Sequence, residues 1–172
     1  MRYKIEDIVA LIGARRYGNA EANIEWLLTD SRSLVFPETS LFFAIKTNIG
    51  DGHNYINELY KRGVRNFVVT KLPDKYNEKY PGTNFLCVID SRKALQRLSE
   101  RHREQYNIPI IGITGSNGKT IVKEWLNQLL QPVMNVTRSP RSYNSQIGVP
   151  LSVWLLDESS QIGVFEAGIS DP

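Results

Sequence analysis

The sequence predicts an α/β fold in two domains, and three observations support that prediction. Short apolar runs alternate with segments of helical period along the chain, which is typical of α/β proteins. A strongly polar helix end meets Pro109 and then a wholly apolar strand, which indicates a domain boundary. The three apolar strands after that boundary have no polar face, so we expect them to be buried on both faces and parallel. The prediction is an N-terminal α/β domain over residues 1–106 and the first part of a parallel-sheet domain over residues 107–172.

Each element follows from its local pattern. Ile5, Ile8, Val9 and Ile12 recur at helical spacing, so an amphipathic helix opens the chain. Runs of about four to seven residues rich in Val, Ile and Phe predict strands. These strands are Ile24–Leu28, Leu41–Ile45, Asn66–Val69, Phe85–Ile89, Ile108–Thr114, Val133–Thr137 and Ile162–Glu166. Further helices are expected near Asn54–Arg62, Ser91–Tyr106, Lys119–Leu130 and Ile147–Leu155.

Composition and charge exclude several classes of protein. The 21 Lys and Arg residues and the 18 Asp and Glu residues give a net charge of +3 and are interleaved, so no basic arm indicates nucleic-acid binding. Cys87 is the only cysteine, which excludes an intramolecular disulfide, and His53 and His102 are too few for a zinc cluster. The apolar runs fall short of the roughly 18 residues of a spanning helix, and Glu6 and Asp7 precede the first of them, which argues against a signal peptide. We expect a cytoplasmic protein without nucleic-acid or membrane partners.

The strongest functional signal is a glycine-rich turn between the strand Ile108–Thr114 and the helix Lys119–Leu130. Glycines let backbone N–H groups point into one concavity, and a helix N-terminus adds positive dipole, so the segment has the context of a phosphate-binding loop. Lys119 would supply the charge for the β and γ phosphates, and the Thr120 hydroxyl would bind Mg²⁺. The predicted nucleotide-binding residues of this turn are Gly115, Ser116, Asn117, Gly118, Lys119 and Thr120.

Two alternatives to that interpretation remain open from the residues alone. Gly112 lies one position too early for the strict Gly-x-x-x-x-Gly-Lys-Thr pattern, so the loop is a variant. A dinucleotide fingerprint through Gly112, Gly115 and Gly118 has the wrong first interval. The other alternative is a plain strand-to-helix turn with an accidental lysine.

The helix that follows has an expected inner face made of Ile121, Val122, Trp125, Leu126 and Leu129.

The order and spacing of several motifs resemble the Mur ligases, the amide-forming enzymes of peptidoglycan precursor synthesis. Motifs similar to their central ATPase domain are Thr114–Thr120, Asn144–Leu151 and Glu166–Gly168. Motifs similar to their N-terminal domain, which grips the UDP-muramoyl substrate, are Thr29–Arg32, Leu41–Lys46 and Asp51–Ile56. Within the family, Asp51–His53 and Glu166–Ser170 look most like the MurF-type ligases, which join D-alanyl-D-alanine to UDP-N-acetylmuramoyl-tripeptide.

The resemblance implies a chemistry and a set of site residues. ATP would phosphorylate the peptide carboxylate, and the amine of D-alanyl-D-alanine would attack the acyl phosphate. Lys119 would be the catalytic cation, and Glu166 would bind Mg²⁺ together with Thr120. Asn144 would lie beside the nucleotide. In the first domain Ser31 and Arg32 would contact the UDP-sugar.

Without the resemblance, three of these groups have simpler interpretations. Glu166 would be an ordinary solvated carboxylate at a strand end, although the phosphate-binding loop upstream argues against that. Asn144 is as well explained as a turn or cap residue. Thr29–Arg32 is a turn whose Asp and Ser side chains satisfy the local backbone.

Other functions also remain open. The chain resembles, less closely, the MurE-type ligase that adds the third peptide residue, and it is compatible with a P-loop switch module that forms no bond. Because the last strand has no crossover helix after it, we expect an uncovered sheet edge and a chain that is the front part of a longer monomeric protein. We expect this part to be inactive alone.

Overall fold

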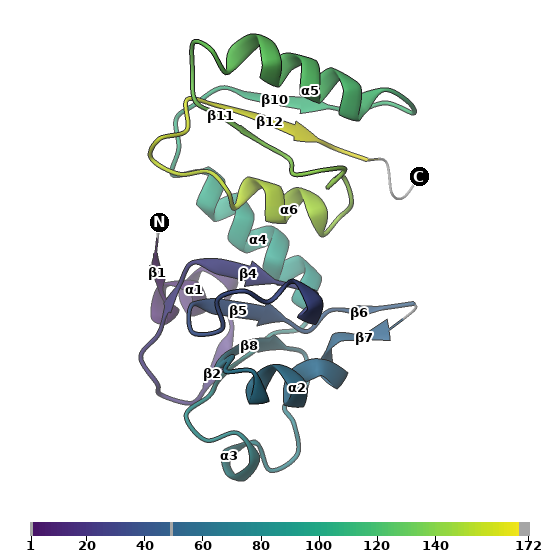
Figure 1. Cartoon of the computed structure of the whole chain (residues 1–172). Helices are drawn as coiled ribbons and strands as arrows, with labels where there is room; N and C mark the ends of the chain where they lie inside the picture. Colours follow the sequence, from purple (N-terminus) through teal and green to yellow (C-terminus); the bar gives the residue numbers. More distant parts are fainter. Residues whose placement is uncertain (1, 49, 169–172) are drawn as a thin grey trace. The chain divides into compact units, whose positions relative to one another are not determined.

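In the computed structural model, which describes residues 2–48 and 50–168, the chain divides into two compact units (Figure 1). The first is Met1–Leu95 and the second is Gln96–Pro172. The division falls inside α4 (Ser91–Arg103), whose second half packs within the second unit. The predicted boundary between functional domains lies between residues 106 and 107, and it stays a prediction.

The first unit is built on a five-stranded sheet in the order β2-β9-β8-β5-β4. Its strands are β2 (Arg15–Tyr17), β4 (Trp26–Leu28), β5 (Ser40–Phe43), β8 (Asn66–Val69) and β9 (Asn84–Cys87). All pairs are parallel except β2 with β9, which is antiparallel. The sequence predicted four of these strands and missed β2, because an edge strand needs no apolar run.

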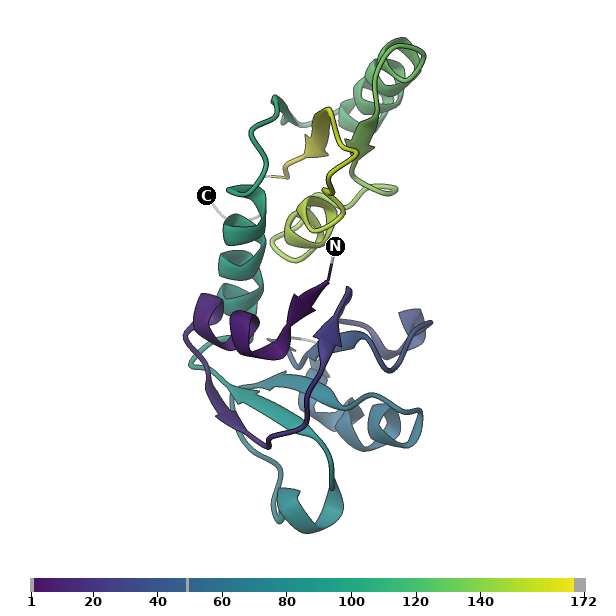
Figure 2. The same cartoon turned by 90° about the vertical axis from the view of Figure 1, so that its left-hand side faces the viewer.

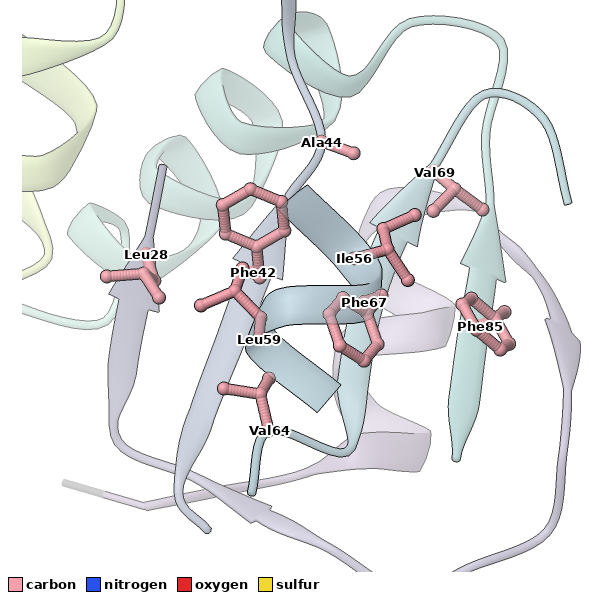
Figure 3. Packing of buried hydrophobic residues seen from close by; sticks show 9 residues of the cluster. All are labelled: Leu28, Phe42, Ala44, Ile56, Leu59, Val64, Phe67, Val69 and Phe85. Carbon is pink, nitrogen blue, oxygen red and sulfur yellow. The ribbon is translucent and has the colours of Figure 1, made fainter. Parts of the chain in front are cut away.

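Aligned aromatic side chains form the core of this unit (Figure 3). The strand register places Phe42 beside Phe67 and Phe67 beside Phe85, and all three are fully buried. The rings of Phe67 and Phe85 are stacked with centroids 5.5 Å apart, in the range where aromatic pairs attract each other. Ile56 and Leu59 of α2 (Ile56–Lys61) pack onto them. This packing holds the carboxyl ends of β5 and β8 side by side.

The other elements of the first unit are short. The predicted first helix is α1 (Ile5–Ile12), which buries Ile5, Ile8 and Ile12 and ends at Gly13 in the left-handed conformation. The remaining elements are β1 (Tyr3–Lys4), β3 (Asn23–Ile24), η1 (Ser31–Ser33), β6 (Lys46–Thr47), β7 (Gly50–Asp51), η2 (Gly52–Tyr55) and α3 (Tyr76–Lys79).

The second unit has a three-stranded parallel sheet in the order β10-β12-β11, as the sequence predicted. Its elements are β10 (Ile110–Ile113), α5 (Lys119–Leu130), β11 (Val136–Arg138), α6 (Gly148–Val153) and β12 (Ile162–Glu166). Figures 1 and 2 show α5 and α6 on opposite sides of this sheet. Only the central strand β12 is buried along its whole length, whereas β10 is half-buried because it lies at the edge.

The prediction for the face of α5 was wrong. Of the residues expected to point inward, Trp125 is 63% exposed and Leu129 is 74% exposed, whereas Lys123 is fully buried. The strands of the sheet cover one side of α5. The loop before α5 and the ion pair of Lys123 with Glu166 determine that this side carries Lys123. The strand β11 also begins later than predicted, because Val133 belongs to the turn that follows α5.

Candidate phosphate-binding site

The turn between β10 and α5 has a backbone that favours glycine. Gly115 has a φ of 136° and Gly118 a φ of 78°, both in the left-handed region. A Cβ at either position would meet no atom within 4 Å, so conformation rather than space requires glycine here. Ser116 and Asn117 lie exposed between them. The turn leads directly into the N-terminus of α5, where free N–H groups and the helix dipole favour an anion.

Lys119 bends back over this turn. Its Nζ donates a hydrogen bond to the carbonyl oxygen of Gly115 at 2.5 Å, so the side chain closes the loop on itself. An ammonium group has three donors, and this bond leaves the others for phosphate oxygens. The sequence placed Lys119 at the start of the helix, and the structure adds that its charge lies over the glycine turn.

Thr120 and Glu166 meet at the carboxyl edge of the sheet. The strand register pairs Ile113 with Glu166, so the end of β12 lies next to the loop that follows β10. The Thr120 hydroxyl, in the first turn of α5, donates to Oε2 of Glu166 at 3.1 Å. The two residues predicted to share a metal ion are therefore in direct contact.

The carboxylate of Glu166 is fully buried, so its interpretation as a solvated strand-end group is wrong. Its backbone N–H donates to the hydroxyl of Ser139 at 3.1 Å. Oε1 makes no hydrogen bond, although Nζ of Lys123 lies 2.9 Å away; the two charges form an ion pair whose alignment is not that of a hydrogen bond. The Lys123 ammonium therefore balances the charge of the carboxylate, while Oε1 keeps lone pairs outside any hydrogen bond.

Oxygen donors at this edge fit a hard cation such as Mg²⁺. The protein offers the Glu166 carboxylate and the Thr120 hydroxyl, and Mg²⁺ typically binds one or two carboxylates together with substrate phosphates and water. Within residues 2–48 and 50–168, no three His, Cys, Asp or Glu side chains gather into a metal-binding cluster.

Asn144 lies at the same edge through its backbone. Its carbonyl oxygen accepts a hydrogen bond from the N–H of Gly168 at 2.7 Å, and Ala167 in turn donates to the carbonyl of Ile113 at 2.9 Å. The loop that carries Asn144 is thus tied to the chain just after Glu166. Ile169 and Ser170, which belong to the Glu166–Ser170 motif, lie outside the described residues.

In the first unit, Ser31 and Arg32 belong to a locally satisfied turn. Asp30 caps η1 by accepting from the backbone N–H of Arg32 at 3.0 Å, and the Arg32 guanidinium pairs with the same carboxylate at 2.7 Å. Hydrogen bonds from the Arg32 side chain and backbone lower the pKa of Asp30. Ser31 is buried, and its carbonyl accepts from Arg62 at 2.7 Å. The turn interpretation is therefore confirmed for the Asp30 side chain, and the Arg32 side chain is exposed.

A separate pocket of about 430 Å³ opens beside His53 in the same unit. The ring Nδ1 of His53 lies 2.6 Å from Oδ1 of Asp51, and its Nε2 accepts from the N–H of Thr70 at 3.1 Å, so Nδ1 carries the proton. The backbone hydrogen bond from His53 lowers the pKa of Asp51. The lining carries Lys46 and Lys71 together with Asp51 and Asp74, and it includes neither Ser31 nor Arg32.

Sequence reasoning missed two notable groups. Lys123 follows Thr120 by three residues, so helical spacing already placed both on one face of α5, but the apolar residues around it drew the prediction elsewhere. His53 was placed in the Asp51–Ile56 motif and rejected as a zinc ligand, but its contact with Asp51 was not predicted. Its neighbour Asp51 is two residues away, and that spacing was the available signal.

Known proteins resemble this chain in sequence and in fold. Residues 113–172 match the family model of the Mur ligase middle domain. The chain is 33% identical over 180 aligned residues to the UDP-N-acetylmuramoyl-tripeptide--D-alanyl-D-alanine ligase of Borreliella burgdorferi, covering 99% of this chain and 39% of that protein. Within residues 2–48 and 50–168, no helix combines the length and the apolar character needed to cross a bilayer.

Solved structures are also similar. A crystal structure of MurF from Acinetobacter baumannii superimposes with a TM-score of 0.88 at 26% identity and covers 100% of this chain and 36% of that one. MurF from Thermotoga maritima, solved in complex with ADP, gives a TM-score of 0.71 at 26% identity over 86% of this chain and 33% of its own. The chain spans less than two fifths of the length of these relatives. It belongs to the Mur ligase family and is MurF-like, comprising the N-terminal region and the start of the middle domain.

Proposed function

We propose that this chain is the substrate-binding and nucleotide-binding part of an ATP-dependent ligase that joins D-alanyl-D-alanine to UDP-N-acetylmuramoyl-tripeptide. The observation that carries the proposal is the meeting of the glycine turn, Lys119, Thr120 and the buried Glu166 at one sheet edge. The relatives that this chain matches are ligases of UDP-N-acetylmuramoyl-tripeptide and D-alanyl-D-alanine, which supports the choice of substrates. We place the activity in the cytoplasm, as the single Cys87 suggests.

The residues of the second unit would solve a problem of charge. The tripeptide carboxylate must attack the γ-phosphorus of ATP, and both groups are negative. The N–H groups at the start of α5 and the Lys119 ammonium would hold the phosphates and spread their charge as the bond to ADP breaks. The products of this step are an acyl phosphate and ADP. The amine of D-alanyl-D-alanine then attacks the acyl carbon and releases phosphate.

Thr120 and Glu166 would hold a Mg²⁺ ion, which supplies charge neutralisation at the β and γ phosphates when bound. The chain fixes both ligands before any ion arrives, because the hydroxyl already donates to the carboxylate. Asn144 would lie beside the nucleotide, on the loop that Gly168 ties to this edge.

The first unit would hold the UDP-muramoyl group. Arg32 has an exposed guanidinium whose planar donors suit a diphosphate, and Ser31 precedes it on the same turn. The pocket beside His53 is lined by Lys46 and Lys71 and also by Asp51 and Asp74, so it offers both donors and acceptors to a polar substrate.

An assay of ATP consumption by the complete protein tests the proposal. ADP release should require both UDP-N-acetylmuramoyl-tripeptide and D-alanyl-D-alanine. Activity with the dipeptide precursor and a free amino acid would instead identify a MurE-type ligase, and turnover without any acceptor would identify a nucleotide switch. The 172-residue chain tested alone should show no tripeptide-dependent ADP release, since it spans under two fifths of its relatives.

A further inference from the structure

Lys123 is a fully buried cation inside the proposed nucleotide site. Its Nζ lies 2.9 Å from Oε1 of Glu166 and 3.4 Å from Oε1 of Glu124, and it donates a hydrogen bond to the carbonyl oxygen of Arg141. Both Lys123 and Glu166 have no exposed side-chain surface. The pair therefore places one positive and one negative charge in the interior of the second unit.

Glu166 is the carboxylate that depends on Lys123. Glu124 is 38% exposed and already binds the guanidinium of Arg138 at 2.5 Å, so solvent and a second cation balance its charge. Among the described residues, Lys123 is the only cation paired with Glu166. A buried charge is stable only when a partner compensates it, so Lys123 balances the carboxylate while no metal is bound.

We propose that Lys123 is the internal counter-ion of Glu166 and that it makes divalent-metal binding depend on nucleotide. The inference rests on the proposed function of this site. With the ammonium in place, the Lys123–Glu166 pair is neutral as a whole and attracts a free divalent cation only weakly. A cation at Oε1 would also lie beside the ammonium and be repelled by it. A nucleotide brings several negative charges, which offset this repulsion. The metal ion therefore enters with the phosphates.

Lys123 also positions the loop that follows β11. The carbonyl that accepts its hydrogen bond belongs to Arg141, a non-glycine residue with a φ of 51°. The same loop begins at Ser139, whose hydroxyl receives the N–H of Glu166. One side chain thus connects α5, the end of β12 and the loop that leads to Asn144. Lys123 acts on the reaction through these groups and is a positioning residue.

Titration of the complete protein with Mn²⁺, followed by the electron paramagnetic resonance of the free ion, tests the proposal. Without nucleotide, the Lys123→Met variant should bind Mn²⁺ at least about tenfold more tightly than the unchanged protein, because the carboxylate loses its counter-ion. Lys123→Arg keeps the charge and should behave like the unchanged protein. In Lys123→Met/Glu166→Gln the gained Mn²⁺ site should disappear. Equal nucleotide-free affinity of the unchanged protein and Lys123→Met would overturn the proposal, as would a gain that survives in the double variant.

Thermal unfolding is a second test, for the case in which Lys123→Met is too unstable for the Mn²⁺ titration. The single variant leaves a buried carboxylate without compensation, whereas Lys123→Met/Glu166→Gln contains neither charge, so the double variant should recover most of the lost melting temperature. No recovery would refute the charge pairing. A separate titration of the unchanged protein uses Mn²⁺ and ADP together. If no Mn²⁺ binds in the presence of ADP, the proposed function of the site is contradicted. The comparison of nucleotide-free affinities does not depend on that result.

Discussion

The hydroxyl of Thr120 donates a hydrogen bond to the Glu166 carboxylate at 3.1 Å, although 46 residues separate them along the chain. Parallel pairing of β10 with β12 brings them together, because Ile113 and Glu166 are register partners and α5 begins just after the glycine turn. Under the proposed function, a hydroxyl and a carboxylate held in this way are pre-arranged for a Mg²⁺ ion bound to nucleotide phosphates. Pre-arrangement matters because a site that is already formed needs no reorganisation when charge develops.

Replacement of Lys119 by Ala should separate the two functions of the chain. In the complete protein we expect turnover to fall at least about 10²–10³-fold, since under the proposed function the residue supplies charge where the transferred phosphate develops it. Binding of UDP-N-acetylmuramoyl-tripeptide should be unchanged, because Lys119 belongs to the second unit and Arg32 to the first. Calorimetry with each ligand measures both effects, and Lys79→Ala, which changes an exposed lysine of α3, is the control. Equal loss of nucleotide and UDP-substrate affinity would show that the functions are not separable.

Replacement of Gly118 by Ala should strain the glycine turn without a steric clash. The residue has a φ of 78°, and a Cβ there meets no atom within 4 Å. A left-handed backbone costs an L-residue about 1–2 kcal/mol, so the free energy of unfolding should fall by about that amount and nucleotide affinity should fall with it. Gly112→Ala is the matched control, because that position also has open space and no positive φ. Chemical denaturation measures the free energy of unfolding of both variants. A Gly118→Ala variant as stable as Gly112→Ala would contradict the prediction.

Gly52 should be intolerant of any side chain for a different reason. A Cβ there would lie 2.7 Å from the backbone nitrogen of Ile45 and 2.8 Å from Cα of Ala44, so the backbone must move. Overpacking of this kind costs about 1–3 kcal/mol, and we expect Gly52→Ala to lose that much stability and to displace His53 next to it. Gly50→Ala, where nothing lies within 4 Å, should be tolerated. Thermal melts and tripeptide binding report the two effects; unchanged values for Gly52→Ala would be inconsistent with the close approach.

His102 should make the second unit less stable in acid. Burial lowers the pKa of His102 below its usual value, and the ring packs against Trp154 while its Nε2 lies 2.9 Å from the carbonyl of Leu156. Between the lowered pKa and the ordinary value of about 6.5, the unfolded chain binds more protons than the folded one. The contribution of His102 to the free energy of unfolding is therefore fully present above about pH 6.5. It is lost as the pH falls towards the lowered pKa.

The comparison is with His102→Phe, which keeps an aromatic ring and removes the titration. The melting temperature of the unchanged protein should fall more between pH 7.5 and pH 5 than that of the variant. Carboxylates contribute equally to both proteins, so the difference isolates the histidine. Parallel pH profiles for the two proteins would rule out this role.

The local pattern of residues was enough to predict several helices and strands and the glycine turn. The strands Asn66–Val69 and Ile162–Glu166 and the helix Lys119–Leu130 have the bounds that the sequence predicted, because apolar runs, glycine punctuation and helical spacing are properties of neighbouring residues. The same locality identified the glycine turn and the ammonium and hydroxyl that follow it. Motif order along the chain was also enough to name the family.

Tertiary structure decided everything that depends on contact between distant segments. Whether Glu166 is solvated or buried depends on the partners of β12, and which face of α5 points inward depends on the sheet and the loop that anchor it. Lys123 shows the physical reason: as a charged side chain it reads as a surface residue, yet Glu166 and the Arg141 carbonyl compensate its charge in the interior. Such compensation comes from residues that only folding brings within a few ångströms.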